Sequence, residues 1–298
     1  MLNARNKLIL QALLVMALWG SLFPMVKVGY SVFNVATVGD TLFFAGMRFT
    51  VCGAIITAFC VLQKKEAFLG IKQVLVPILL MGFFAVVLHY GCMYLGLTMT
   101  AGAKTSILKQ VGMLFYICFS AFVFPEDKLT LRKLIGTVLG ILGIIVVNID
   151  ASGFHIGIGD WLIIASSFAM MISNVISKKT VAHVDPIVAT GISQLFGGMI
   201  LLCVGFASGG ALTYTSAKTG VVFFYICAAS IVSYCLWYSV VKKGALSDLF
   251  IIKFAETLFA AIFGAILLGE QIFHVSYLAA FLFICTGIWI AEKKPSKE

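Results

Sequence analysis

Charged residues are scarce in this chain. Asp, Glu, Lys and Arg make up 11% of its 298 residues, hydrophobic residues make up 61%, and the mean hydropathy is +1.09. A soluble domain is nearer a quarter charged. The composition therefore excludes an ordinary soluble domain and predicts a polytopic membrane protein. The net charge of +9 does not indicate nucleic-acid binding, because the basic residues occur in short groups between apolar runs.

Several motifs are absent as well. The eight cysteines lie within apolar runs and form no CxxC pattern, so we expect neither a zinc site nor a disulfide framework. No G-x-x-x-x-G-K-[ST] motif indicates ATP-driven work, and no nucleophile elbow or His/Asp/Glu cluster indicates an enzyme. We predict no catalytic residues, cofactor or metal. The N-terminal apolar run continues to about Tyr30 without a clear A-x-A exit, which favours a membrane helix over a cleaved signal peptide.

Long apolar segments are abundant instead. Each is close to the roughly 20 residues needed to span a bilayer, and such segments must be helical because lipid cannot satisfy bare backbone groups. Their uniform hydropathy excludes the period-2 alternation of a closed barrel. The sequence therefore predicts an all-α integral membrane protein with ten transmembrane helices, at 8–30, 39–62, 73–96, 100–124, 132–149, 157–178, 187–208, 219–240, 246–268 and 272–291.

The basic residues outside these segments fall almost entirely on one side of the membrane. The termini and the even-numbered connections hold fifteen of the 21 Lys and Arg, whereas the odd-numbered connections hold only Lys218. By the positive-inside rule, both termini of a multi-pass cell-membrane protein (inner or plasma membrane) are predicted to be cytoplasmic. The remaining five lie inside membrane segments and are Lys27, Arg48, Lys104, Lys109 and Lys253.

The two halves of the chain resemble one another. Ile107–Phe115 (ILKQVGMLF) aligns with Ile251–Phe259 (IIKFAETLF) at an offset of 144 residues. Five helices is an odd number, so two five-helix repeats, expected at 1–150 and 151–298, must insert in opposite directions. Inverted repeats are typical of transporters, whose substrate site lies near the midplane between the repeats around a central cavity.

The paired lysines are the strongest site candidates. Lys109 lies roughly 13 Å below the outer end of its segment, and Lys253 lies roughly 10 Å above the inner end of its own. A charge at such depth costs about 2.5 to 3.5 kcal/mol and usually faces a bundle interior or an aqueous cavity. We expect both to contact an anionic substrate, although lysines bonded to helix-end carbonyls or reaching to the interface would also fit.

Several short motifs resemble the EamA-like branch of the drug/metabolite transporter superfamily. They are ALWGSLFPMVKVGY (17–30), the Arg48-Phe49 pair, and the segments FPE (124–126) and LGE (268–270) before a final Gly-containing helix. The resemblance covers essentially the whole chain. It implies export or exchange of small metabolites by alternating access. The family often has Pro about three residues after the positions of Lys109 and Lys253, where this chain has Gly112 and Glu256.

The other candidate residues have two readings each. Glu256 either pairs with Lys253 at i+3 or binds a substrate amine or a proton. Lys27 and Arg48 stand where the family commonly has a basic residue, and either contact substrate or pack helices. Trp19 is expected to line the cavity entrance or to pack near it. His89 and Tyr90, in the middle of the third segment, are either packing residues or part of the cavity and a proton relay.

Together these features predict a secondary transporter of a small polar or anionic metabolite such as an amino acid or organic acid. Its partners would be that substrate and the lipid bilayer, with a coupled proton or counter-substrate as an open alternative, and no nucleic acid. A monomer and a homodimer both fit. The alternatives are a drug or organic-cation exporter and, more remotely, a membrane-embedded enzyme or a non-transporting interaction protein. A cation site should show an acidic excess, whereas basic residues dominate here.

Overall fold

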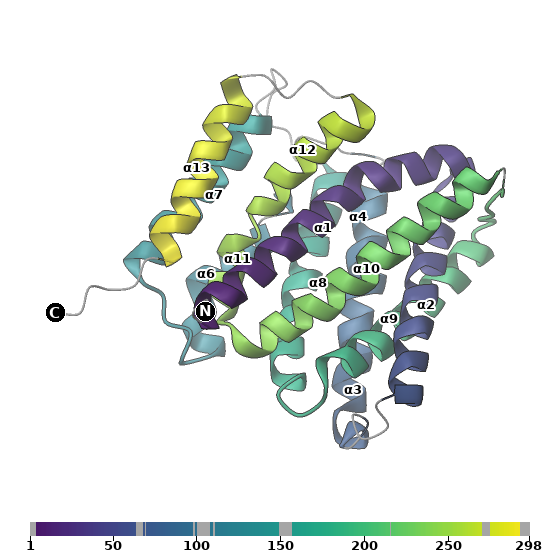
Figure 1. Cartoon of the computed structure of the whole chain (residues 1–298), viewed down its shortest axis with the longest axis horizontal. Coiled ribbons are helices and arrows are strands. Elements are labelled where there is room, and N and C mark those ends of the chain that lie inside the picture. Colours follow the sequence, from purple (N-terminus) through teal and green to yellow (C-terminus); the bar gives the residue numbers. More distant parts are fainter. Residues whose placement is uncertain are drawn as a thin grey trace.

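The computed structural model describes residues 4–63, 68, 70–97, 99, 108–109, 111–148, 157–214, 216–269 and 275–292. The elements formed by these residues are all helical (Figure 1). In chain order they are α1 (Ala4–Phe33), α2 (Val38–Gln63), α3 (Ile71–Gly82), the π-helix η2 (Phe83–Leu88), α4 (His89–Leu97), α6 (Val111–Val123), α7 (Leu131–Asn148), α8 (Ile158–Thr180), α9 (Pro186–Ala207), α10 (Ala217–Lys243), α11 (Leu246–Ile252), α12 (Ala255–Leu268) and α13 (Val275–Glu292).

The all-α fold class and the ten predicted segments are confirmed. A helix, or a run of consecutive helices, occupies every predicted segment. Within the described residues, seven helical stretches are long and apolar enough to cross a membrane by length and composition. The other three are shorter, with 13 residues in α6 and 18 each in α7 and α13. Most of 100–110 and the start of the tenth segment lie outside the described residues.

Two segments that were predicted as continuous helices are interrupted. The third runs through α3, η2 and α4, and the ninth is divided into α11 and α12 by Lys253 and Phe254. In a π-helix the backbone bonds skip one residue more than in an α-helix, so the wider turn changes the direction in which the following side chains point. His89 and Tyr90 come directly after this wider turn, and the His89 N–H donates to the carbonyl of Phe84.

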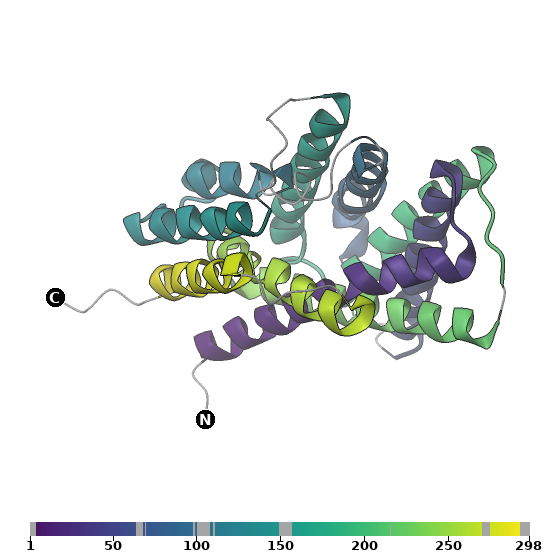
Figure 2. The ribbon, with the colours of Figure 1, turned by 90° about the horizontal axis from the view of Figure 1, so that it is seen from above.

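Corresponding helices of the two repeats make equivalent contacts. α7 and α13 have bounds 144 residues apart at both ends, and they lie side by side. α2 packs against α9, its counterpart, at the opposite end of the molecule (Figures 1 and 2). Between these pairs, α1 contacts α10 and α12, and in the exchanged arrangement α8 contacts α4 and α6. Such reciprocal contacts are those of a pseudo-two-fold axis. The division at residue 150 remains a prediction, because 149–156 lie outside the described residues.

Small residues let the counterpart helices approach closely. On the α2–α9 contact, a Cβ added to Gly46 would overlap the backbone of Leu202, and one added to Gly198 would overlap that of Thr50. Close backbone approach is the usual basis of helix association where lipid removes the hydrophobic drive. The two end pairs therefore hold the repeats together and enclose the helices that carry the polar site.

Candidate functional site

Lys253 lies at the break between α11 and α12. The turn there is tightened, with the Phe254 N–H bonded to the Ile251 carbonyl and the Glu256 N–H bonded to the Lys253 carbonyl, three residues back in both cases. Neither Pro nor Gly occurs at this point, so the sequence carries no signal for the break. Packing supports it instead, because the Phe254 ring fills the space beside Gly140 of α7 that any Cβ there would occupy. Discontinuous helices of this kind frequently border transporter substrate sites.

The ammonium group of Lys253 lies beside two indole rings. Its Nζ is 5.0 Å from the ring centroid of Trp19 on α1 and 5.8 Å from that of Trp237 on α10. The residue is 7% exposed, and among the described residues its Nζ has no hydrogen-bond acceptor and no carboxylate within 4 Å. Cation–π contacts contribute up to about 2 kcal/mol each when desolvated, which offsets part of the cost of burying the charge. Lys253 is thus held in place with its hydrogen-bonding capacity unused.

The indole N–H groups of the two tryptophans differ in their bonding. Trp237 donates to Oδ1 of Asn174 on α8 at 2.7 Å, so its orientation is fixed. The Trp19 N–H is buried and has no acceptor within the described part of the chain. Buried donors are normally satisfied, and an exception calls for an explanation by an unseen partner. An indole N–H and an ammonium group near one another suit an anionic group such as a carboxylate.

The i+3 spacing suggested an ion pair between Glu256 and Lys253, but Glu256 bonds to a different lysine. Its Oε1 lies 3.4 Å from Nζ of Lys109, the counterpart lysine from the first repeat. Lys109 also lies 4.5 Å from the ring centroid of Phe23 on α1. The two side chains are 19% and 12% exposed, so the pair remains accessible to water. The structure therefore joins one lysine of the symmetric pair to a carboxylate and leaves the other, Lys253, without one among the described residues.

Tyr90 meets its own counterpart. Its hydroxyl lies 3.0 Å from that of Tyr234, which is 144 residues later in the chain. Contacting residues that are related by a two-fold axis must straddle that axis, so this pair places it near the centre of the molecule. Tyr234 in turn packs edge-on against Trp19, with centroids 5.4 Å apart. Tyr90 is thus linked through Tyr234 to Trp19, one of the rings beside Lys253.

The remaining predicted residues take different positions. Arg48 is 3% exposed, donates from Nε to the Ser230 hydroxyl at 2.9 Å, and lies over the Phe49 ring. His89 is buried against α8, where its Nδ1 lies 3.0 Å from the Ser166 carbonyl. This hydrogen bond is what a buried histidine with a packing role would make. Lys27 is an exposed side chain on α1, two helical turns beyond Trp19.

Trp237 and Tyr234 were not predicted. Both come from α10, three residues apart and so on one face of the helix. A signal was present in the repeat offset, which aligns Tyr90 with Tyr234 and Tyr94 with Tyr238. The bond between Trp237 and Asn174 joins residues 63 positions apart, which no local sequence pattern indicates.

A second polar cluster lies where the α6–α7 connection meets the start of α11. Lys133 Nζ is 2.9 Å from a carboxylate oxygen of both Asp127 and Asp248, and it donates to the Ser247 hydroxyl at 2.6 Å. Asp127 also accepts from the Tyr116 hydroxyl at 3.2 Å and from the N–H and hydroxyl of Ser247. Burial raises the pKa of Asp127, but the bonds from Ser247 and Lys133 lower it by more, so the net pKa is lowered. This cluster ties the first repeat to the second.

The substitution Asp127→Asn should lower the free energy of unfolding by about 2 to 3 kcal/mol at neutral pH, because it removes hydrogen bonds to a buried charge. A carboxylate with a lowered pKa stabilises the fold above its unfolded value near 4, and this contribution is lost as the pH falls through the folded value. Thermal unfolding in detergent should therefore show an acid-induced loss in the wild type that is smaller in the variant. Glu126→Gln, which changes the exposed neighbouring carboxylate, is the control. Identical acid profiles for Asp127→Asn and the wild type would contradict the assignment.

Membrane-spanning helices in two related halves, with charged groups buried where the halves meet, are typical of membrane transporters. The chain belongs to the EamA-like transporter family, whose model matches residues 6–149 and again residues 157–291. The double match coincides with the two repeats, and the resemblance seen in the motifs is confirmed.

Similar proteins include some that are named as transporters or efflux pumps. The uncharacterized transporter YvbV of Bacillus subtilis is 26% identical over 99% of this chain and 94% of its own length. A probable amino-acid metabolite efflux pump of Escherichia coli is 32% identical over 58% of this chain and 54% of its own. A WAT1-related chloroplastic protein of Arabidopsis thaliana is 24% identical over 88% of this chain, which spans 64% of that relative. One solved crystal structure has the same fold, with a TM-score of 0.79, 17% identity and 96% coverage of both chains.

Proposed function

We propose that this chain transports a small zwitterionic metabolite of the amino-acid type by alternating access. The observation that carries the proposal is the asymmetry of the lysine pair. Lys253 offers an ammonium group without a carboxylate partner among the described residues, whereas Lys109 is already bonded to Glu256. The substrate carboxylate would bind Lys253 and the Trp19 N–H, and the substrate amine would bind Glu256. A ligand with one anionic and one cationic end matches these groups in sign.

The comparisons support this substrate class without deciding it. A relative named as a probable amino-acid metabolite efflux pump shares 32% identity over 180 residues. In this proposal the chain exports or exchanges its substrate across the cell membrane with both termini in the cytoplasm. Opening toward that side would require the cluster around Asp127 to part, because it links the two repeats there. Glu256 would be the group that receives the amine, which would then replace Lys109 as its partner.

An organic-cation exporter is the second candidate. Aromatic faces such as those of Trp19, Trp237 and Tyr234 are the usual receptors for organic cations. Here, however, the ammonium group of Lys253 already lies against the two indoles, and an added cation would be repelled by it. The three aromatic rings alone would suit an organic cation, but with Lys253 beside them they favour it less.

A ligand-stabilisation screen followed by counterflow in proteoliposomes distinguishes these functions. Purified protein would be heated with amino acids, organic acids, phosphorylated metabolites or organic cations. Zwitterions should raise the melting temperature most, and the best of them should accelerate counterflow of its labelled form. If organic cations alone stabilise and exchange, the second candidate is correct and the proposal fails.

A further inference from the structure

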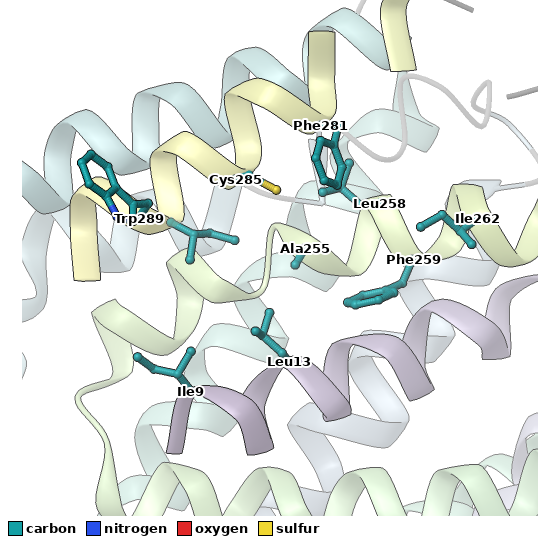
Figure 3. Close-up of a pocket in the computed structure, with 10 residues that line it drawn as sticks. Ile9, Leu13, Ala255, Leu258, Phe259, Ile262, Phe281, Cys285 and Trp289 are labelled. Atoms are coloured by element: carbon teal, nitrogen blue, oxygen red, sulfur yellow. The ribbon is translucent and has the colours of Figure 1, made fainter. Parts of the chain in front are cut away.

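An apolar groove opens between α1, α12 and α13 (Figure 3). It has a volume of about 540 Å³. Its lining is formed by apolar side chains from these three helices, and they are Ile9, Leu13, Ala255, Leu258, Phe259, Ile262, Phe281, Cys285, Ile288 and Trp289. Several of them are largely exposed in the absence of lipid, including Trp289 at 62% and Phe281 at 49%. In the bilayer, acyl chains surround these helices, so the groove faces hydrocarbon.

A second hollow lies next to the start of α1 and the α10–α11 connection, at the end of the molecule that the charge distribution predicts to be cytoplasmic. It has a volume of about 360 Å³ and is lined by the basic residues Arg5 and Lys243 together with Asp248. The two hollows share elements, since Leu8 and Ile9 are adjacent on α1, and Ile252 and Ala255 flank the helix break. Asp248, the acidic residue of this lining, is bonded to Lys133 at 2.9 Å, and Arg5 and Lys243 are its basic residues.

The geometry points to a bound anionic phospholipid, with its phosphate at Arg5 and Lys243 and one acyl chain in the groove. Basic pockets between membrane helices on the cytoplasmic side suit anionic headgroups. Trp289, near the end of α13, lies where amphipathic rings usually mark the interface. From Trp289 back to Phe281 the groove runs roughly 12 Å along α13, which is a depth that only a chain inserted in the hydrocarbon region would occupy.

We assign the groove to a lipid and not to the passage of substrate. α1 and α12 are in direct contact behind it, where a Cβ on Gly20 would overlap the backbone of Ala260 and the Cβ of Phe259. A lipid in the groove would instead contact α12 and the α10–α11 connection at once. It would thereby bridge the two sides of the break at Lys253 and stabilise the arrangement of α11 and α12 seen here.

Native mass spectrometry of the purified chain, incubated with equal amounts of phosphatidylglycerol and phosphatidylcholine, tests this site. One phosphatidylglycerol should be retained per chain in preference to phosphatidylcholine. Each basic residue near a membrane surface contributes about fivefold in affinity. The double variant Arg5→Gln/Lys243→Gln should therefore bind phosphatidylglycerol about 25-fold more weakly. Lys243→Glu, which changes an exposed side chain and leaves Arg5 in place, should bind it at least fivefold more weakly. Lys242→Gln, beside it on the same helix end but outside the hollow, should keep wild-type binding.

A bulky substitution that fills the groove tests whether the acyl chain binds there. Ile262→Trp should fill it and displace the lipid, whereas Ile266→Trp, one turn along α12 and 70% exposed, should not. Equal retention of both lipids by the wild type would overturn the proposal. So would unchanged phosphatidylglycerol binding in Lys243→Glu, or a dimer that forms through the groove in the absence of lipid. All of these outcomes are independent of the substrate and leave the proposed function untouched.

Discussion

Replacing Lys253 by methionine is expected to reduce transport by at least about 100-fold. Methionine keeps the length and apolar stem of the side chain, but it removes the ammonium group that lies beside the rings of Trp19 and Trp237. Losing the buried partner of a ligand charge typically costs about 3 kcal/mol or more, which corresponds to roughly two orders of magnitude in affinity. The measurement is counterflow of the best zwitterion in proteoliposomes with equal amounts of inserted protein.

The thermal stability of Lys253→Met should be equal to or higher than that of the wild type. A buried charge without a carboxylate partner costs free energy, and removing it relieves that cost. A purely structural lysine would give the opposite result, because its loss would destabilise the fold. Lys242→Met, an exposed lysine outside the site, controls for the change in net charge. Wild-type counterflow by Lys253→Met would remove this residue from the site.

Replacing Glu256 by glutamine is expected to reduce transport of zwitterions by about 10- to 100-fold while affecting substrates without an amine much less. The carboxylate is the only described acidic group found in the polar site, and a charge-assisted bond to a substrate amine is roughly twice as strong as a neutral one. Stability should fall by no more than about 1 kcal/mol, because the bond to Lys109 is partly exposed and screened. Initial rates for an amino acid and for the corresponding acid without the amine would provide the comparison.

Exchanging the two partners separates the structural role of this pair from its role in recognition. The double variant Lys109→Glu/Glu256→Lys restores an ion pair between the same positions but moves the carboxylate to the first repeat. We expect recovery of thermal stability without recovery of zwitterion transport. If the exchange restores both, the pair is structural and the amine binds elsewhere.

The tyrosine pair shows how the repeats produce one asymmetric site. Tyr90 and Tyr234 are counterparts and meet across the pseudo-two-fold axis. Lys109 and Lys253 are also counterparts, yet Glu256 corresponds to Gly112, and Gly112 is covered by the backbone of α8 at Ser167. The frame is therefore symmetric, whereas the charges around it are not. Such a site suits a substrate whose two ends differ.

The polar cluster around Asp127 and the break in the ninth segment together suggest how α11 and α12 could move during alternating access. α11 is only seven residues long and is tied at its start to the first repeat through Ser247 and Asp127. α12 continues beyond the break and carries Glu256. In our proposal, the turn at Lys253 and Phe254 lets these two parts move separately as the repeats rock.

The architecture could be predicted from the amino-acid sequence. Lipid leaves a spanning segment no alternative to the helix, so hydropathy located all ten segments, and the basic residues and the 144-residue offset indicated their topology and duplication. It also drew attention to Lys109, Lys253 and Glu256, because charges inside apolar segments are conspicuous.

Only the tertiary structure decided how these groups are combined. The i+3 spacing favoured a bond between Glu256 and Lys253, but the carboxylate bonds to Lys109, 147 positions away. The break at Lys253 contains neither Pro nor Gly, and it depends on the space that Gly140 leaves for Phe254. The rings beside Lys253 come from α1 and α10, which are distant in the chain. Local periodicity reports which side of a helix is apolar, whereas partners across helices depend on packing angles and breaks that no single segment encodes.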